Sequence, residues 1–165
     1  MATKQEVVSV IERMSKAFRN FQPQSIEAMK DQAEIWVEKL AVYPGLIVQQ
    51  AGEFAIENYK FFPAMSEMLS ECKRVFAVEI ERCNSKWLNL RDPMLHNPVG
   101  KKPARTEFEK LAQDWRRIGR TDQADFVLKY YEDYKDREWT PPSPEKVEAF
   151  RQKCAIAAKK MSVRE

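Results

Sequence analysis

An uninterrupted amphipathic stretch from residue 64 to residue 91 is the feature that most constrains the fold of this chain. It contains no proline and no glycine, and its apolar positions recur at steps of three or four: Met65, Leu69, Cys72, Phe76, Ile80, Cys83 and Trp87. This spacing places the apolar side chains on one face of an α-helix. With a rise of about 1.5 Å per residue, the helix would be about 40 Å long and would extend beyond a small bundle.

The second half of that helix presents an apolar surface that something must cover. Its residues are Ile80, Cys83, Trp87 and Leu88. Large exposed apolar patches mark sites for protein partners, so this surface is a candidate protein-partner site. The alternatives are cover by the C-terminal helices of the same chain, or by a second copy in a homodimer built through the long helix.

Helical periodicity continues on both sides of the long stretch, and no segment has the period-two alternation of a β-strand. Four glycines and 32% charged residues also favour long solvated helices. We expect an all-α protein of about seven helices. It divides into an N-terminal bundle of four (1–91), a proline-rich and basic linker (92–105) and a C-terminal subdomain of three (106–165).

Short signals predict where several of these helices begin and end. Thr3 with Glu6, and Thr106 with Glu109, have the spacing of a capping box. Gly119 is placed to terminate the helix that Thr106 begins.

Two proline junctions and two apolar stripes complete the helical pattern. Phe61-Phe62-Pro63 separates the third and fourth helices, and both phenylalanines are expected to fill the core. Ser143-Pro144 opens the last helix, whose apolar stripe is Val147, Phe150, Cys154, Ala157, Ala158 and Met161. The helix over residues 122–138 is expected to turn an acidic face outward and the following residues inward: Phe126, Val127, Tyr130 and Tyr134.

The charge is distributed in blocks of alternating sign. Residues 101–120 hold 7 basic and 3 acidic positions (+4), and residues 121–139 hold 3 and 6 (−3). Alternating blocks usually belong to helices with complementary faces. A basic surface beside Trp115 could instead track a phosphate backbone and stack a base, so the candidate nucleic-acid contacts are Lys101, Lys102, Arg105, Arg116, Arg117 and Arg120.

No residue pattern typical of an enzyme, a metal site or a cofactor site is visible. There is no Gly-rich phosphate loop, and the cysteines Cys72, Cys83 and Cys154 lack the close spacing of a zinc knuckle. His96 is the single histidine, and a Cys–His pair is the alternative to a solvated loop histidine. The acidic pairs Glu67/Glu71 and Asp122/Asp125 are typical of solvated faces, with a hard cation as the alternative. We predict a binding protein and not an enzyme.

The expected location is the cytoplasm, without membrane contact. No apolar run approaches the roughly 20 residues that span a bilayer. The N-terminus also lacks the basic and then apolar pattern of a secretory signal.

One further pattern lies between Met29 and Cys72. It reads Trp36-x-x-x-Leu40-x-x-Tyr43-Pro44, then Val48 and Ala51, then Phe61-Phe62-Pro63 followed by Glu67. It resembles the N-terminal domain of the bacteriophage replicative-helicase loader/inhibitor family, small helical proteins that hold a bacterial or phage hexameric helicase and help deliver it to an origin. The resemblance covers about a quarter of the chain.

The resemblance implies a replicative helicase as the partner. Family members engage it through a less ordered C-terminal part, whereas this chain carries helix start signals at Thr106 and Ser143, so no individual contact residue is carried over. We therefore predict a phage-type DNA replication accessory protein that binds a replicative helicase. The alternatives are a helical protein that binds nucleic acid directly, and a phage-encoded inhibitor of a host protein.

Overall fold

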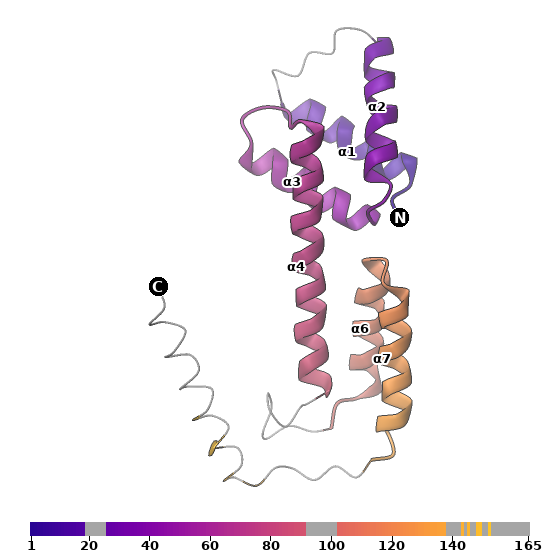
Figure 1. Ribbon diagram of the computed structural model, residues 1–165, viewed down its shortest axis with the longest axis vertical. Coiled ribbons are helices and arrows are strands. Elements are labelled where there is room, and N and C mark those ends of the chain that lie inside the picture. Colours follow the sequence, from indigo (N-terminus) through magenta and orange to yellow (C-terminus); the bar gives the residue numbers. More distant parts are fainter. Residues whose placement is uncertain are drawn as a thin grey trace.

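The computed structural model describes residues 1–18, 26–91 and 102–137, with backbone alone for 26–29, and the single positions 143, 145, 148, 149 and 152. The described residues form six helices and no strand (Figure 1): α1 Lys4–Ala17, α2 Ile26–Leu40, α3 Gly45–Asn58, α4 Met65–Arg91, α6 Arg105–Arg117 and α7 Thr121–Tyr134. The predicted all-α class and the long helix are confirmed. Most of the predicted linker and of the last helix lies outside the described residues.

Helix α4 is the spine of the molecule. It runs along the longest axis, with α1, α2 and α3 around its first half and the α6–α7 hairpin beside its second half (Figure 1). The hairpin packs on α4 mainly through α6. Helices of the same chain therefore provide the cover that the second half of α4 requires.

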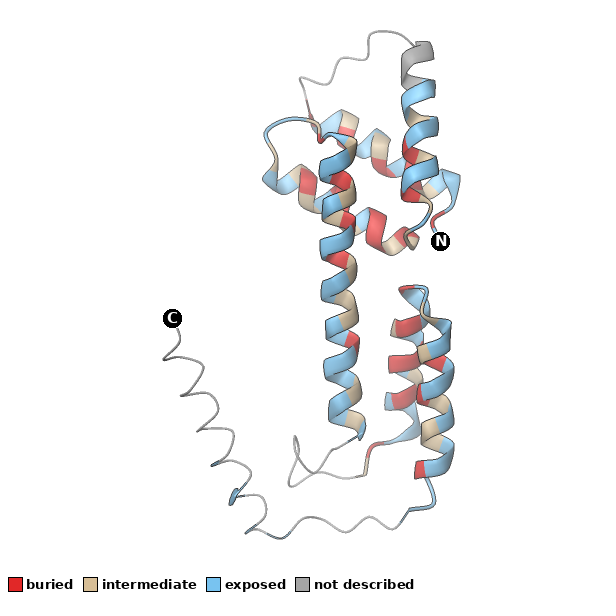
Figure 2. Cartoon of the chain, in the orientation of Figure 1, coloured by how far each residue is buried: buried red, intermediate tan, exposed pale blue. Residues whose placement is uncertain are grey.

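The first unit packs α1 against α3, and α3 against the first half of α4. Its buried side chains are apolar (Figure 2): Val7, Val10, Met14, Phe18, Trp36, Leu40, Ile47, Val48, Ala51, Ala55, Met68, Cys72 and Val75. The crossing of α1 and α3 is close, because a Cβ at Gly52 would lie only 2.5 Å from Val10 Cγ1. Gly52 is thus required by packing.

The start of α1 is capped as predicted. Thr3 Oγ1 accepts a hydrogen bond from the Glu6 N–H (3.3 Å), and Glu6 Oε2 accepts one from the Thr3 N–H (2.7 Å). The Ala2 N–H donates to the Tyr43 carbonyl at 2.6 Å. The Ala2–Tyr43 bond ties the beginning of α1 to the turn between α2 and α3.

Only one of the two phenylalanines before Pro63 fills the core. The Phe62 ring packs 5.4 Å from that of Trp36 and 6.0 Å from that of Phe18, measured between centroids. Phe61 is 68% exposed, so the prediction that both rings are inward was wrong for Phe61. In an extended segment, successive side chains point in opposite directions, which explains the difference.

The N-cap of helix α6 lies two residues before the predicted N-cap, Thr106. Ala104 is the N-cap, and Glu107 Oε2 accepts a hydrogen bond from the Ala104 N–H at 2.8 Å. The predicted partner Glu109 instead forms an ion pair with Arg105 at 2.8 Å. The Thr106–Glu109 box was therefore wrong, because Glu107 occupies the position from which a carboxylate reaches back to the cap.

The end of α6 is as predicted. Gly119 has φ of 74°, a conformation that disfavours residues with a Cβ. The Gly119 N–H donates to the Arg116 carbonyl (3.0 Å) and the Arg120 N–H to the Trp115 carbonyl (2.8 Å), the two bonds of a Schellman motif. This tip abuts the first unit, since a Cβ at Gly119 would lie 3.3 Å from Pro44 Cγ.

Candidate partner-binding surfaces

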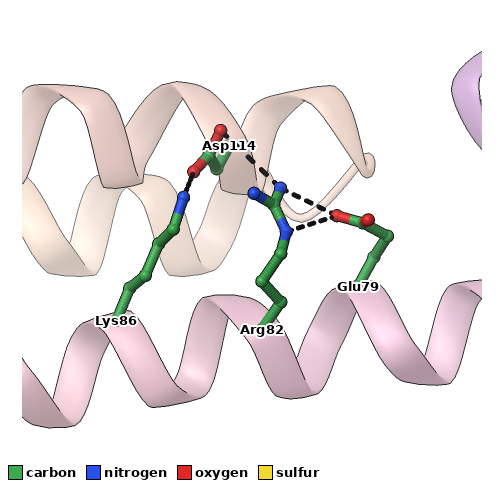
Figure 3. A network of polar contacts seen from close by, with 4 residues as sticks. All are labelled: Glu79, Arg82, Lys86 and Asp114. Atoms are coloured by element: carbon green, nitrogen blue, oxygen red, sulfur yellow. Dashed lines mark hydrogen bonds and ion pairs between the residues drawn. The ribbon is translucent and has the colours of Figure 1, made fainter.

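Four charged side chains join α4 to α6 (Figure 3). Lys86 Nζ lies 2.6 Å from Asp114 Oδ2, and the Arg82 guanidinium lies 2.8 Å from Glu79 Oε2 and 3.9 Å from Asp114 Oδ1. The carboxylate side chains are 15% (Asp114) and 13% (Glu79) exposed, whereas both cations are nearly half exposed. The network therefore sets the register of the hairpin on α4 while remaining open to screening by salt.

Cys72 and Cys83 lie in the first and second halves of α4, and neither has exposed surface. Burial raises the pKa of the Cys72 thiol to about 12 and also raises the pKa of Cys83. Both are therefore protonated and poorly nucleophilic at neutral pH. His96, which the alternative Cys–His pair would require, lies outside the described residues, as does Cys154.

The hairpin covers most of the predicted protein-partner surface on α4. Cys83 is fully buried, and Ile80 and Trp87 are partly buried against the core. Leu88 is 43% exposed. Of the four residues, Leu88 is therefore the one that remains exposed, while Ile80 and Trp87 keep partial exposure.

An aromatic row lies between α4 and α7. The Trp87 ring contacts the rings of Phe126 and Tyr130 edge-on, with centroids 5.5 Å and 4.8 Å apart. Phe126 is 52% exposed, so the prediction that it faces inward was wrong. Helix α7 packs on α6 through Val127 and its neighbours, so Phe126 lies at the edge of the buried face of α7. The periodicity of the sequence does not distinguish a residue at that edge from one in the core.

The first two predicted nucleic-acid contacts fall in or near the linker. Lys101 lies outside the described residues. Lys102 Nζ donates to the carbonyls of Lys135 (2.5 Å) and Arg137 (2.8 Å) and lies 5.0 Å from the centre of the Tyr134 ring. Lys102 therefore caps backbone carbonyls just beyond the C-terminal end of α7, where a positive charge is favoured.

The four predicted arginines lie on α6 or at its end. Three of them pair with carboxylates of the hairpin, at N···O distances of 2.8, 3.2 and 3.4 Å: Arg105 with Glu109, Arg116 with Asp125, and Arg120 with Asp122. Arg117 is exposed and pairs with none of the described carboxylates. Trp115 is 3% exposed and cannot stack on a base.

The hairpin as a whole is close to neutral. Residues 102–137 hold 9 basic and 8 acidic positions, a net charge of +1. Its outer face has an open groove of about 430 Å³ between α6 and α7, whose charged lining mixes both signs: Arg105, Glu109, Arg116, Lys129 and Glu132. The predicted cations are thus interleaved with carboxylates.

The sequence did not predict the exposure of three large apolar side chains of the first unit. Ile35, Val42 and Phe61 are 53%, 62% and 68% exposed. Each directly precedes an aromatic residue that packs with the core: Trp36, Tyr43 and Phe62. A helical stripe identifies the buried member only for Trp36, because Tyr43 and Phe62 lie outside the helices.

The predicted acidic pairs are engaged within the chain. Glu67 accepts a hydrogen bond from the Ala64 N–H at the start of α4, and Glu71 accepts one from the Tyr59 hydroxyl at 3.0 Å. Within residues 1–18, 26–91 and 102–137, no group of three or more metal-ligating side chains comes together. No helix in the same ranges is long and apolar enough to cross a bilayer.

Comparisons with models of protein families, with curated proteins and with solved structures found no match to this chain.

Proposed function

We propose that this protein is a DNA replication accessory protein that binds a hexameric replicative helicase, like the phage loader/inhibitor proteins that it resembles. The observation that supports this proposal most is that the residues of the resemblance belong to one folded unit. Trp36 is 3% exposed, Val48 and Ala51 are fully buried, and Phe62 packs on Trp36. A helicase partner places the protein in the cytoplasm.

We assign the contact to the exposed apolar side chains of that unit, Ile35, Val42 and Phe61. Burial of one such side chain contributes about 1.5–3 kcal/mol, which corresponds to more than tenfold in affinity. An aspartate at any of these positions removes that contribution and leaves a charge in the contact.

A protein partner is favoured over direct nucleic-acid binding because most of the predicted basic contacts already have partners within the chain. A phosphate would have to compete with Glu109, Asp125 and Asp122 for the arginines. The buried Trp115 ring offers no surface for stacking. Four of the six residues predicted for a nucleic-acid site therefore have intramolecular partners: Lys102, Arg105, Arg116 and Arg120.

The experiment is a pull-down of the tagged full chain from a bacterial lysate, with and without nuclease. We expect a replicative helicase among the retained proteins in both cases. The triple variant Ile35→Asp/Val42→Asp/Phe61→Asp should lose it. The matched control is Val78→Asp, because Val78 is a 54% exposed apolar side chain outside residues 29–72, which carry the resemblance.

Two results would count against the proposal. Retention that disappears with nuclease would indicate direct nucleic-acid binding. Retention of a different host protein, with no helicase, would favour the inhibitor alternative. Circular dichroism of each variant establishes that loss of binding is not loss of fold.

A further inference from the structure

Helix α2 is buried on one side and exposed on the other (Figure 2). Trp36 and Leu40 are buried, and Ala33 and Val37 are half-buried beside them. The helix packs on α1 and, over a shorter contact, on α4. Because the buried positions recur at steps of three or four, the opposite side of α2 is the stripe through residues 31, 35, 38 and 42.

Two large apolar side chains lie on this exposed stripe. Ile35 is 53% exposed and Val42 is 62% exposed. They are seven residues apart, which is two helical turns, so they point in nearly the same direction. The helical course continues past Leu40, because the Ala41 N–H donates to the Val37 carbonyl at 2.9 Å. A solvated helix face is polar at its centre, so two aligned apolar side chains there indicate a contact surface.

The same face carries three exposed carboxylates: Asp31, Glu34 and Glu38. Asp31 is one turn before Ile35, and Glu38 is one turn before Val42, so acidic and apolar side chains alternate along the stripe. Asp31 and Glu34 form no hydrogen bond or ion pair through their side chains with any described residue. Both charges are therefore open to a partner.

The exposed cations of α2 lie at the borders of this face. At about 100° per residue, Lys30 and Lys39 are each rotated by roughly a quarter turn from the centre of the stripe. Lys39 Nζ is paired with Glu38 at 2.9 Å. The centre of the face is therefore acidic and apolar.

This combination favours a basic amphipathic helix over other occupants. A second copy docked through the same face would set the carboxylates of one α2 against those of the other, and like charges repel across an interface. The phosphates of nucleic acid and of anionic lipids are repelled in the same way. A helix with lysines or arginines around an apolar stripe complements both features.

We propose that this face of α2 binds a basic amphipathic helix of the partner protein. The apolar stripe of that helix packs on Ile35 and Val42, and its basic side chains pair with Asp31, Glu34 and Glu38. The identity of the partner rests on the proposed function, whereas the chemistry of the contact is tested without a helicase.

The probe is a fluorescently labelled synthetic peptide with leucines at steps of three and four on one face and lysines beside them. Its affinity for the full chain is measured by fluorescence anisotropy at low ionic strength. Asp31→Lys/Glu34→Lys should weaken binding at least about fivefold, because each substitution replaces an attraction with a repulsion. A second peptide with glutamates in place of the lysines should bind this variant more tightly than the wild type.

The matched control is Glu57→Lys/Glu81→Lys, which makes the same change of net charge at exposed positions of α3 and α4. It should leave the affinity for the lysine peptide unchanged. Circular dichroism establishes that both variants are folded. Three results would overturn the proposal: no binding of the lysine peptide by the wild type, equal affinity of the wild type and Asp31→Lys/Glu34→Lys, or equal binding of both peptides by the wild type.

Failure of this contact and failure of the proposed function give different results. If the peptides show the expected charge preference but no helicase is retained in the pull-down, the contact is supported and the partner is a different protein. If the wild type and Asp31→Lys/Glu34→Lys retain the helicase equally, the helicase proposal stands and the basic-helix contact is overturned.

Discussion

Replacing Asp114 with asparagine is expected to loosen the hairpin on α4 while the first unit stays folded. The Asp114 carboxylate is the only side chain of α6 in the network of Figure 3, and it faces Lys86 and Arg82 of α4. Asparagine keeps the volume of the side chain but removes the charge. Arg82 retains its pairing with Glu79.

The structure sets the size of the effect. Exposed ion pairs contribute about 0.2–1 kcal/mol each. Asp114 is only 15% exposed and meets two cations, so a loss of about 1 kcal/mol is expected. That loss would raise the population of the opened hairpin about fivefold.

Cys83 reports this opening, because it is fully buried on the half of α4 that the hairpin covers. The rate of its modification by N-ethylmaleimide should rise about fivefold in Asp114→Asn. Cys72, buried in the first unit, should be unaffected. At high salt the difference between variant and wild type should shrink, because the pairs are then screened.

Asp125→Asn is the control, since Asp125 pairs with Arg116 within the hairpin and its side chain is 72% exposed. It should change the modification rate of neither Cys72 nor Cys83. Equal acceleration of Cys72 and Cys83 in Asp114→Asn would mean that the variant destabilises the whole chain. Unchanged rates would mean that the network does not hold the hairpin. Either result would refute the reasoning.

Three other substitutions test the packing and the caps. Gly52→Ala should lower the free energy of unfolding by about 1–3 kcal/mol in urea titrations, because its methyl group collides with Val10. Hydrogen bonding to Thr3 lowers the pKa of Glu6, so its stabilising effect is present at neutral pH and lost as the pH falls through the lowered value. Glu6→Gln should therefore be less stable than wild type at pH 7 and equal to it in acid, as measured by thermal unfolding. Tyr134→Phe should leave the melting temperature unchanged or raise it, because the buried Tyr134 hydroxyl has no hydrogen-bond partner among the described residues.

The helices themselves were predictable because their signals are local. The absence of proline and glycine from residues 64–91 predicted α4, and Gly119 predicted the end of α6. The start of α6 was displaced because Glu107 and Glu109 are both acidic and only the geometry shows which one reaches the cap. Capping arguments therefore give the position of a helix end to within a residue or two.

The candidate surfaces were less predictable because exposure depends on tertiary packing. Phe61 and Phe62 are chemically identical neighbours, yet only Phe62 packs on Trp36. Similarly, a count of basic residues cannot show that Arg116 pairs with Asp125 across the hairpin. Burial and ion pairing arise from contacts between helices, which a sequence pattern does not specify.

The most direct test of the helicase proposal is a sedimentation experiment with a purified hexameric replicative helicase, ATP and Mg²⁺ at micromolar concentrations. We predict a complex that sediments faster than the helicase alone. Phe61→Asp should weaken it at least about tenfold, the loss expected when one buried apolar contact is replaced by a charge. Phe126→Asp, which alters the other unit, should leave it intact. Absence of any complex with the wild-type chain would contradict the proposed function, and equal binding by Phe61→Asp would contradict the assigned surface.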